Sequence, residues 1–176
     1  MEELALHILD IAENSIEAGA GSLEIELREE PEADRLLLIV SDDGPGMTAG
    51  ILEKVQDPFY TTRTTRKVGM GLALLAQAAR AAGGELTLES EPGRGTTVRA
   101  SLQYTHLDRA PVGDIETTLM VLMAGHPDLQ IRFRHSLGSR EYELDSGEFD
   151  GLLLPVRLSR LRAAIRAGEE GLQCAT

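Results

Sequence analysis

The stretch at residues 4–20, LALHILDIAENSIEAGA, constrains the fold more than any other part of the chain. At about 100° per residue, a helix here gathers its apolar side chains on one arc and its polar side chains on the opposite one. The apolar arc consists of Ala5, Ile8, Leu9, Ile11, Ala12 and Ile16. The polar stripe consists of His7, Asp10, Asn14 and Glu17. This pattern predicts an amphipathic helix that lies with its apolar arc on a sheet.

The central position of Asn14 in this helix needs an explanation. Asparagine is a poor helix former, because its amide competes for backbone hydrogen bonds. A solvated polar face is the common explanation of such a stripe. The alternative is that the amide binds something, and the motifs further along the chain favour that alternative.

Composition and charge exclude several classes of function. A chain of 176 residues supports one substantial core, or one core with a sizeable extension. Aromatic residues make up 3% and the net charge is −12, so a nucleic-acid partner is not expected. Cys174 is the only cysteine, which excludes internal disulfides and a cysteine-based metal site. The start, MEELALHILD, resembles neither a signal peptide nor a membrane span, so we expect a cytoplasmic protein with no membrane contact.

The first part of the chain reads as alternating helices and strands. Residues 22–28 and 35–41 predict a β-hairpin, and the continuous apolar run RLLLIVS predicts a second strand buried on both faces or nearly so. Further elements are expected as a short helix at 51–55, a helix at 72–82, and strands at 85–90 and 96–103. Residues 1–103 therefore predict an α+β fold, a two-layer sandwich with helices on one face of a mixed sheet.

Residues 104–176 form a C-terminal α/β extension that we expect to pack on the first part, because no linker-like composition separates the two. A helix is expected within 111–125, a second hairpin at 129–135 and 140–144, and a short helix at 158–167. Arg160, Arg162 and Arg166 on that last helix are interpreted as a solvated face.

Two glycine-rich motifs have both a structural and a functional interpretation. DDGPGM at 42–47 follows a strand, where it is either a tight turn or a place where a ligand approaches the backbone beside a carboxylate. GMGL at 69–72 opens a helix after a cation-rich loop, where it is either a plain helix start or a phosphate cradle. Neither motif by itself distinguishes the structural interpretation from the functional one.

Taken together and in order, these motifs resemble the GHKL ATPase superfamily, which includes DNA gyrase, the ninety-kilodalton heat-shock chaperones, histidine kinases and the MutL mismatch-repair proteins. The motifs that carry the resemblance are DIAENSIEAGA, DDGPGM, DPFYTT, GMGLAL and GRGTTV, all within residues 1–103. The resemblance implies the Bergerat ATP-binding fold, with ATP and Mg²⁺ as ligands.

The resemblance also implies a role for single residues at the nucleoside end of ATP. Asp42 matches the residue that hydrogen-bonds the adenine amino group, and Thr96 lies close to the adenine. Met47 packs against the adenine ring, and Gly44 and Gly46 let the ligand approach the turn.

At the phosphate end, Asn14 matches the residue that coordinates the Mg²⁺ bridging the phosphates. The phosphate-binding hinge is assigned to the stretch Gly69, Met70, Gly71 and Leu72. Lys67 and Arg66 are placed near the outer phosphates, and Thr62 of DPFYTT is assigned to the nucleotide site as well.

Asp10 is the candidate catalytic residue. It lies one helical turn before Asn14, where the ATP-hydrolysing and serine-kinase branches of the superfamily carry a glutamate as general base. Aspartate is one methylene shorter and therefore reaches a water less well. His7, a further turn away, is either a second polar contact or a half-buried helix histidine.

Three functions stay open at this point. The lid sequence DPFYTTR resembles that of histidine kinases, whereas ENSIEAGA resembles the MutL proteins. Because the first helix already carries the Asn motif, the chain is not expected to be a complete sensor kinase. The first hypothesis is a kinase that transfers the γ-phosphate to a partner protein, and the second is a slow ATPase that acts as a conformational switch. The third is a partner-binding module with a vestigial ATP site. Homodimerisation is a further expectation.

Overall fold

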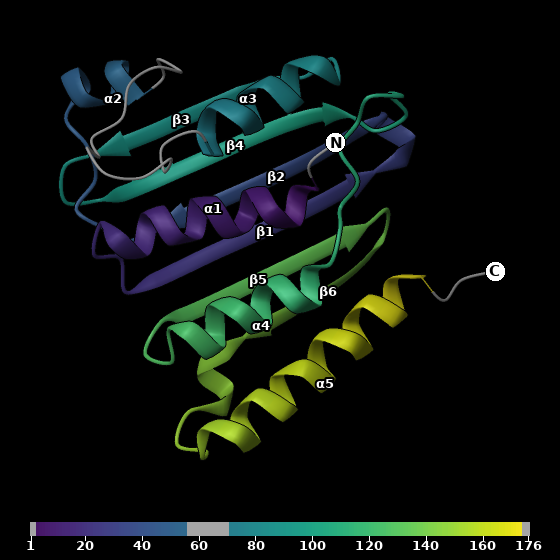
Figure 1. Ribbon diagram of the computed structural model, residues 1–176. Helices are drawn as coiled ribbons and strands as arrows, with labels where there is room; N and C mark the ends of the chain where they lie inside the picture. Colours follow the sequence, from purple (N-terminus) through teal and green to yellow (C-terminus); the bar gives the residue numbers. More distant parts are fainter. Residues whose placement is uncertain (1–2, 56–70, 174–176) are drawn as a thin grey trace.

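The computed structural model describes residues 3–55 and 71–173, which form one layer of helices on one mixed sheet (Figure 1). The helices are α1 (Leu4–Glu17), α2 (Ala49–Val55), α3 (Gly71–Ala81), α4 (Ile115–Gly125) and α5 (Leu154–Gln173). The strands are β1 (Ser22–Glu30), β2 (Arg35–Asp42), β3 (Leu86–Glu91), β4 (Gly95–Gln103), β5 (Gln130–Leu137) and β6 (Arg140–Asp145). Short 3₁₀ turns occupy Pro31–Ala33 and Ser146–Phe149.

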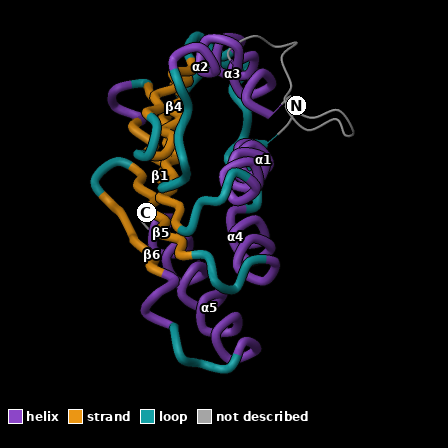
Figure 2. The backbone as a smooth tube through the Cα atoms, turned by 90° about the vertical axis from the view of Figure 1, so that its left-hand side faces the viewer, coloured by secondary structure: helices purple, strands orange, loops and turns teal. Residues whose placement is uncertain are grey.

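The strands lie in the order β3-β4-β2-β1-β5-β6. β1 runs parallel to β5, and the other neighbouring pairs are antiparallel. Seen edge-on, α1, α3, α4 and α5 lie on the same side of the sheet (Figure 2). The prediction of a two-layer α+β fold with a mixed sheet is therefore confirmed.

α1 lies in the middle of the helical layer, where it packs against the sheet and contacts α3 and α4 on its two flanks. Its predicted apolar arc is largely right, since Ala5, Ile8 and Ile11 belong to the core. The predicted polar stripe is wrong at His7, which is only 1% exposed. The reason is that neighbouring helices bury a wider arc of α1 than contact with a sheet alone would.

β2 is not buried on both faces, contrary to the expectation from RLLLIVS. Leu36, Leu38 and Val40 face the helices and are buried, whereas Leu37 and Ile39 on the other face are half-buried. This alternation arises because α1, α3, α4 and α5 cover only one face.

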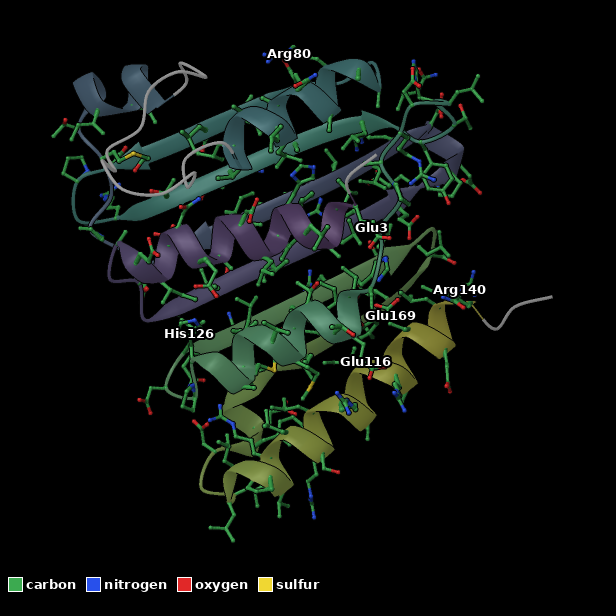
Figure 3. The ribbon with its side chains drawn as sticks, viewed as in Figure 1. Glu3, Arg80, Glu116, His126, Arg140 and Glu169 are labelled. Carbon is green, nitrogen blue, oxygen red and sulfur yellow. The ribbon has the colours of Figure 1, made fainter. Side chains whose placement is uncertain are left out.

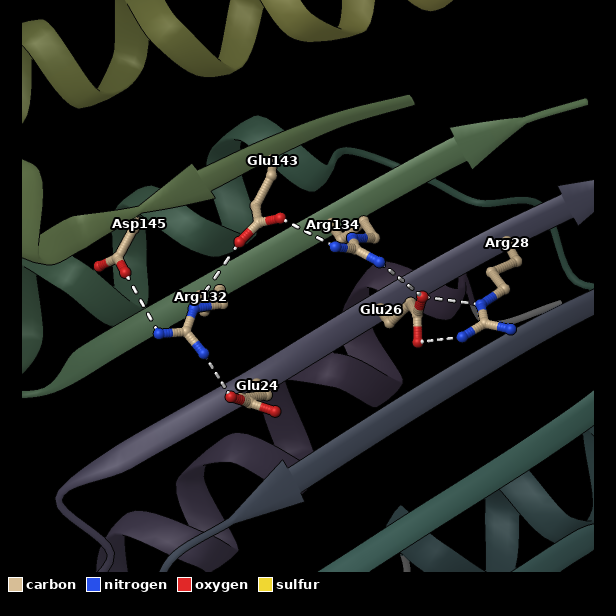
Figure 4. Close-up of polar contacts among 7 residues, drawn as sticks. All are labelled: Glu24, Glu26, Arg28, Arg132, Arg134, Glu143 and Asp145. Carbon is tan, nitrogen blue, oxygen red and sulfur yellow. Dashed lines mark hydrogen bonds and ion pairs between the residues drawn. The ribbon is translucent and has the colours of Figure 1, made fainter. Parts of the chain in front are cut away.

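The opposite face of the sheet carries a lattice of ion pairs (Figure 4). Arg132 on β5 lies 2.6 Å from Glu24 on β1 and 3.5 Å from Asp145 on β6. Arg28 lies 2.7 Å from Glu26. These side chains are largely exposed, so each pair contributes little to stability, but together they keep the uncovered face polar.

Residues 104–173 continue the same sheet. β5 pairs with β1 from Ser22↔Gln130 to Glu29↔Leu137, and β6 completes the second hairpin that the sequence predicts. α5 is longer than the predicted helix at 158–167, because its last turns are held by tertiary contacts. Gly168 packs directly on the ring of Tyr142, where a Cβ would overlap the ring.

A buried ionic cluster fastens α5 to the sheet. His135 on β5, 3% exposed, lies between two carboxylates, with Nδ1 2.8 Å from Glu169 on α5 and Nε2 3.0 Å from Glu29 on β1. The Tyr142 hydroxyl donates to Glu169 at 2.6 Å. Burial disfavours the imidazolium, but hydrogen bonds to the two carboxylates stabilise it more and raise the pKa of His135 to about 9.

This cluster predicts that the protein loses stability on the alkaline side of neutrality. The pKa of His135 lies above its unfolded value of 6.5, so its contribution is complete below that pH and is lost as the pH rises through about 9. We expect a decrease on the order of 3 kcal/mol in the free energy of unfolding, measured by urea denaturation across this range. His135→Gln should flatten the decrease, whereas His126→Gln, which removes an exposed pair with Glu13, should keep it. An equal decrease in both variants would contradict the prediction.

Candidate functional site

The candidate site lies where the end of β2 meets α1 and the start of β4. Asp42 is the last residue of β2 and pairs with Thr96 in the strand register. Its carboxylate accepts hydrogen bonds from Ser15 Oγ on α1 at 2.7 Å, from the Gly44 N–H at 2.9 Å and from the Thr96 N–H at 3.2 Å. Two segments that are distant in sequence, together with the adjoining turn, thus fix one half-buried carboxylate.

The turn after β2 is fixed by its glycines and by Ser90. Gly46 has φ +65°, and a Cβ there would overlap the carbonyl oxygen of Glu91 on β3. The Met47 N–H donates to Ser90 Oγ at 2.8 Å, and Ser90 Oγ donates to the Gly95 carbonyl at 2.9 Å. Ser90 Oγ also lies 2.9 Å from Thr96 Oγ1. DDGPGM is therefore a tight turn, packed on the β3–β4 hairpin and next to the Asp42 carboxylate.

The two neighbouring aspartates of this motif do different things. Asp43 accepts hydrogen bonds from the backbone N–H groups of Gly21 and Ser22, both at 2.8 Å. These bonds, chiefly the one from Ser22, hold the pKa of the Asp43 carboxyl below its usual value. Asp43 thus anchors the link between α1 and β1, whereas Asp42 belongs to the candidate site.

Asp10 and Asn14 lie one turn apart on α1, with Asp10 exposed and Asn14 half-buried. Asn14 is the only asparagine in the chain. The buried Gly71, which begins α3, packs against Asp10, and a Cβ there would lie 2.9 Å from the Asp10 Cβ. The structure therefore brings the start of α3 directly to the candidate catalytic residue, with the half-buried Leu72 next in the helix.

The structure gathers part of the predicted site and leaves part of it undescribed. Asp10 and Asn14 lie on α1, and Gly71 and Leu72 open α3, which begins against Asp10. Asp42, Gly44, Gly46, Met47 and Thr96 lie in and beside the turn after β2. Five predicted residues lie outside the described part of the chain: Thr62, Arg66, Lys67, Gly69 and Met70.

Sequence reasoning missed Ser15 and Ser90. Ser15 is a hydroxyl on the buried side of α1, and Ser90 follows Leu86 and Leu88 in the alternation of β3. Both serines stand at positions where the apolar pattern faces the core. That pattern could have identified them, because a buried hydroxyl needs a hydrogen-bond partner.

The chemistry of the available side chains limits how a metal ion could be held. Within residues 3–55 and 71–173, the side chains of His, Cys, Asp and Glu form no group of three that could hold an ion. Mg²⁺ takes few protein oxygens when phosphates and water supply the rest. A half-buried Asn14 amide on α1 suits that kind of coordination and does not suit an all-protein cage.

A separate finding concerns membranes. None of the helices in the described ranges combines the length and the hydropathy that crossing a bilayer requires.

Comparison with known proteins gives a consistent result. The family model described as "Histidine kinase-, DNA gyrase B-, and HSP90-like ATPase" matches residues 2–106. The sensor protein kinase FleS of Pseudomonas aeruginosa is 41% identical over 109 residues, covering 62% of this chain and 26% of that protein. The sensor histidine kinase WalK of Bacillus subtilis is 36% identical over 95 residues, covering 51% of this chain and 15% of that protein.

These relatives are much longer than the region they share with the chain, which spans about a quarter of their length or less. Among solved structures, the N-terminal domain of a DNA repair protein matches with a TM-score of 0.57 and 16% identity. That match covers 82% of this chain and 53% of the other. It supports the fold.

The geometry of the turn after β2 predicts that a methyl group added at Gly46 strongly destabilises the protein. Gly46→Ala should lower the free energy of unfolding by about 2 kcal/mol or more, because the Cβ overlaps a carbonyl and φ is positive. Gly50→Ala is the matched control: it lies in α2 with nothing within 4 Å of its Cβ, so it should be neutral or slightly stabilising. Urea denaturation of both variants checks this, and equal stabilities would contradict the packing of the turn.

Proposed function

Because the chain belongs to the family of histidine kinase-, DNA gyrase B- and HSP90-like ATPases, we propose that it binds Mg-ATP and transfers the γ-phosphate to a partner protein. The observation that carries the proposal is the Asp42 carboxylate, fixed at the end of β2 by Ser15, Gly44 and Thr96. We propose a cytoplasmic location, because an ATP-dependent activity needs a compartment that supplies ATP.

At the adenine end, Asp42 acts as the hydrogen-bond acceptor. An ionised carboxylate has about four acceptor positions, and the three hydrogen bonds place two donors on Oδ1 and one on Oδ2. The position left on Oδ2 can accept from the exocyclic amino group of adenine. Met47, half-buried beside the turn, supplies an apolar surface for the ring.

At the phosphate end, Asn14 is the residue that would hold Mg²⁺ through its amide oxygen. The ion, when bound, neutralises charge on the phosphates. Asn14 lies four residues beyond Asp10 on the same helix, so both side chains face the same region near the start of α3.

Hydrolysis is the second candidate function, and the position of Asp10 favours it. Its exposed side chain sits on the first residue of α3, where it could accept a proton from an attacking water. A slow ATPase of this kind would act as a nucleotide-driven switch. The third candidate, a binding module with a vestigial site, is disfavoured by the presence of Asn14, Asp42 and Gly71.

The acceptor of the phosphoryl group is proposed to be another protein. The relatives are sensor kinases by name, and the chain matches about a quarter of them or less. Incubation with labelled ATP and extract of the native cell should therefore label a specific protein. Absence of any labelled protein would count against transfer and leave nucleotide binding to be tested separately.

Asn14→Ala should weaken Mg-ATP binding by about tenfold to a hundredfold, because the amide is the proposed protein ligand of the ion. Isothermal titration should show the loss with Mg²⁺ present and little difference between variant and wild type with EDTA. Glu13→Gln is the matched control, since Glu13 is a neighbour on α1 whose side chain faces His126. A flat titration of the wild-type protein with adenine nucleotides would refute the proposed function.

Asp10→Asn separates hydrolysis from binding. The variant should keep its affinity for Mg-ATP within about a factor of two and lose about a hundredfold in the rate of phosphate release, because the amide cannot accept the proton. A phosphate-release assay under single-turnover conditions measures this. If release continues at the wild-type rate, the ATPase hypothesis must be abandoned.

A further inference from the structure

Three oxygen atoms meet in the β3–β4 hairpin, beside the Asp42 carboxylate. They are Oγ of Ser90 on β3, Oγ1 of Thr96 on β4 and the backbone carbonyl oxygen of Gly95. Ser90 Oγ lies 2.9 Å from each of the other two. Oxygens at this distance repel each other unless a proton lies between them, so each of the two gaps needs one proton.

Only one assignment of the protons fills both gaps. A carbonyl carries no proton, so the gap between Ser90 and Gly95 is filled by the proton of Ser90. A hydroxyl has only one proton, so the gap between Ser90 and Thr96 is filled by the proton of Thr96. Ser90 Oγ also accepts from the Met47 N–H at 2.8 Å, which uses its second lone pair. Ser90 is then fully satisfied, and Thr96 is the donor in the pair.

The direction of this hydrogen bond decides what Thr96 can offer a ligand. Because its one hydroxyl proton points at Ser90, the Thr96 hydroxyl can meet a ligand only as an acceptor. Thr96 stands opposite Asp42 in the strand register, and its backbone N–H donates to Asp42 Oδ1 at 3.2 Å. The Asp42 carboxylate and the Thr96 hydroxyl, which lie at the proposed adenine position, are therefore both acceptors.

We propose that Ser90 is a positioning residue for the nucleotide: it keeps the Thr96 hydroxyl an acceptor, and the site therefore prefers a 6-amino purine to a 6-oxo purine. This role rests on the proposed function, in which Asp42 accepts from the amino group of adenine. An amino group has two hydrogens, so it can donate to Asp42 and to Thr96 at once.

A 6-oxo purine is rejected at Thr96 and not at Asp42. Hypoxanthine has an oxygen in place of the amino group and carries a proton on N1. Its N1–H can still donate to Asp42, but its oxygen then faces the Thr96 hydroxyl, which has no proton to give. Two acceptors placed against each other are both left without a partner, and this lowers the affinity. The discrimination therefore depends on where the Thr96 proton points, and hence on Ser90.

Isothermal titration with ATP and with inosine triphosphate, each with Mg²⁺, measures the preference as a ratio of dissociation constants. The wild-type protein should bind ATP about tenfold to a hundredfold more tightly. Ser90→Ala removes the acceptor, so the Thr96 proton can turn to the purine oxygen and the ratio should fall by about tenfold. Thr96→Val removes the hydroxyl and should lower the ratio by a similar factor, through weaker binding of ATP.

A double-mutant cycle separates this role from a merely structural one. Ser90 also holds the turn through the Met47 N–H, and loss of that bond alone would weaken both nucleotides alike. In the Thr96→Val background, Ser90→Ala should leave the ratio unchanged, because no hydroxyl proton remains to be redirected.

Ser101→Ala is the matched control. Ser101 makes the same kind of contacts at the other end of the hairpin, where its Oγ accepts from the Glu85 N–H at 3.1 Å and donates to the Glu85 carbonyl at 3.4 Å. Its removal therefore costs comparable backbone contacts without touching Thr96. The variant should keep the wild-type ratio.

The alkaline decrease in stability reports whether the variants are folded. It depends on His135 and its partner Glu169, which lies on α5, at the other end of the sheet from β3 and β4 (Figure 3). Ser90→Ala, Thr96→Val and Ser101→Ala should all retain it. If Ser90→Ala does not fold, Thr96→Val alone still decides, since a loss of affinity for inosine triphosphate as large as that for ATP would overturn the inference.

Three further results would overturn the inference even though ATP binds. They are an unchanged ratio in Ser90→Ala, an equal fall of the ratio with and without the Thr96 hydroxyl, and an equal fall in Ser101→Ala. A flat titration of the wild-type protein with both nucleotides is a different result, because it refutes the proposed function itself and this role of Ser90 with it.

Discussion

The hydrogen bonds around the Asp42 carboxylate hold together the part of the molecule on which the proposed function depends. They join the last residue of β2 to α1 through Ser15, to the following turn through Gly44, and to β4 through Thr96. A carboxylate that accepts several hydrogen bonds is held in one position. The same bonds that fix the local fold also set the direction of the acceptor position that the proposed contact with the adenine amino group would use.

The pairing of β5 with β1 places the C-terminal residues in the same framework. β5 runs parallel to β1, so the chain cannot enter β5 through a tight hairpin. It reaches β5 through α4, which lies in the helical layer. The His135 cluster then fixes α5 against β1 and β6 through Glu29, Glu169 and Tyr142. α4 is thus attached to α1, and α5 is attached to the edge of the sheet at β6.

The sequence predicted what depends on local pattern and order. The 22–28/35–41 and 129–135/140–144 hairpins, the helix with Asn14, and the family all follow from periodicity and motifs. Residues whose environment comes from packing could not be predicted. His7 is buried by flanking helices, Leu37 is half-buried because one face of the sheet is uncovered, and α5 continues past residue 167 because Gly168 fits against Tyr142. The role of Ser15 could not be predicted either, since its hydrogen-bond partner Asp42 is 27 residues away in the sequence.

The contact between Asp10 and Gly71 bears on which reaction the site favours. Only glycine lets α3 begin this close to α1, since a Cβ would press on Asp10. A carboxylate on a side chain one methylene shorter than glutamate stays nearer to its own helix, and so reaches less far toward a water in line with the γ-phosphate. A phosphoryl acceptor delivered by a partner does not depend on that reach to the same degree, because the partner positions its own nucleophile. We therefore place transfer to a protein ahead of hydrolysis.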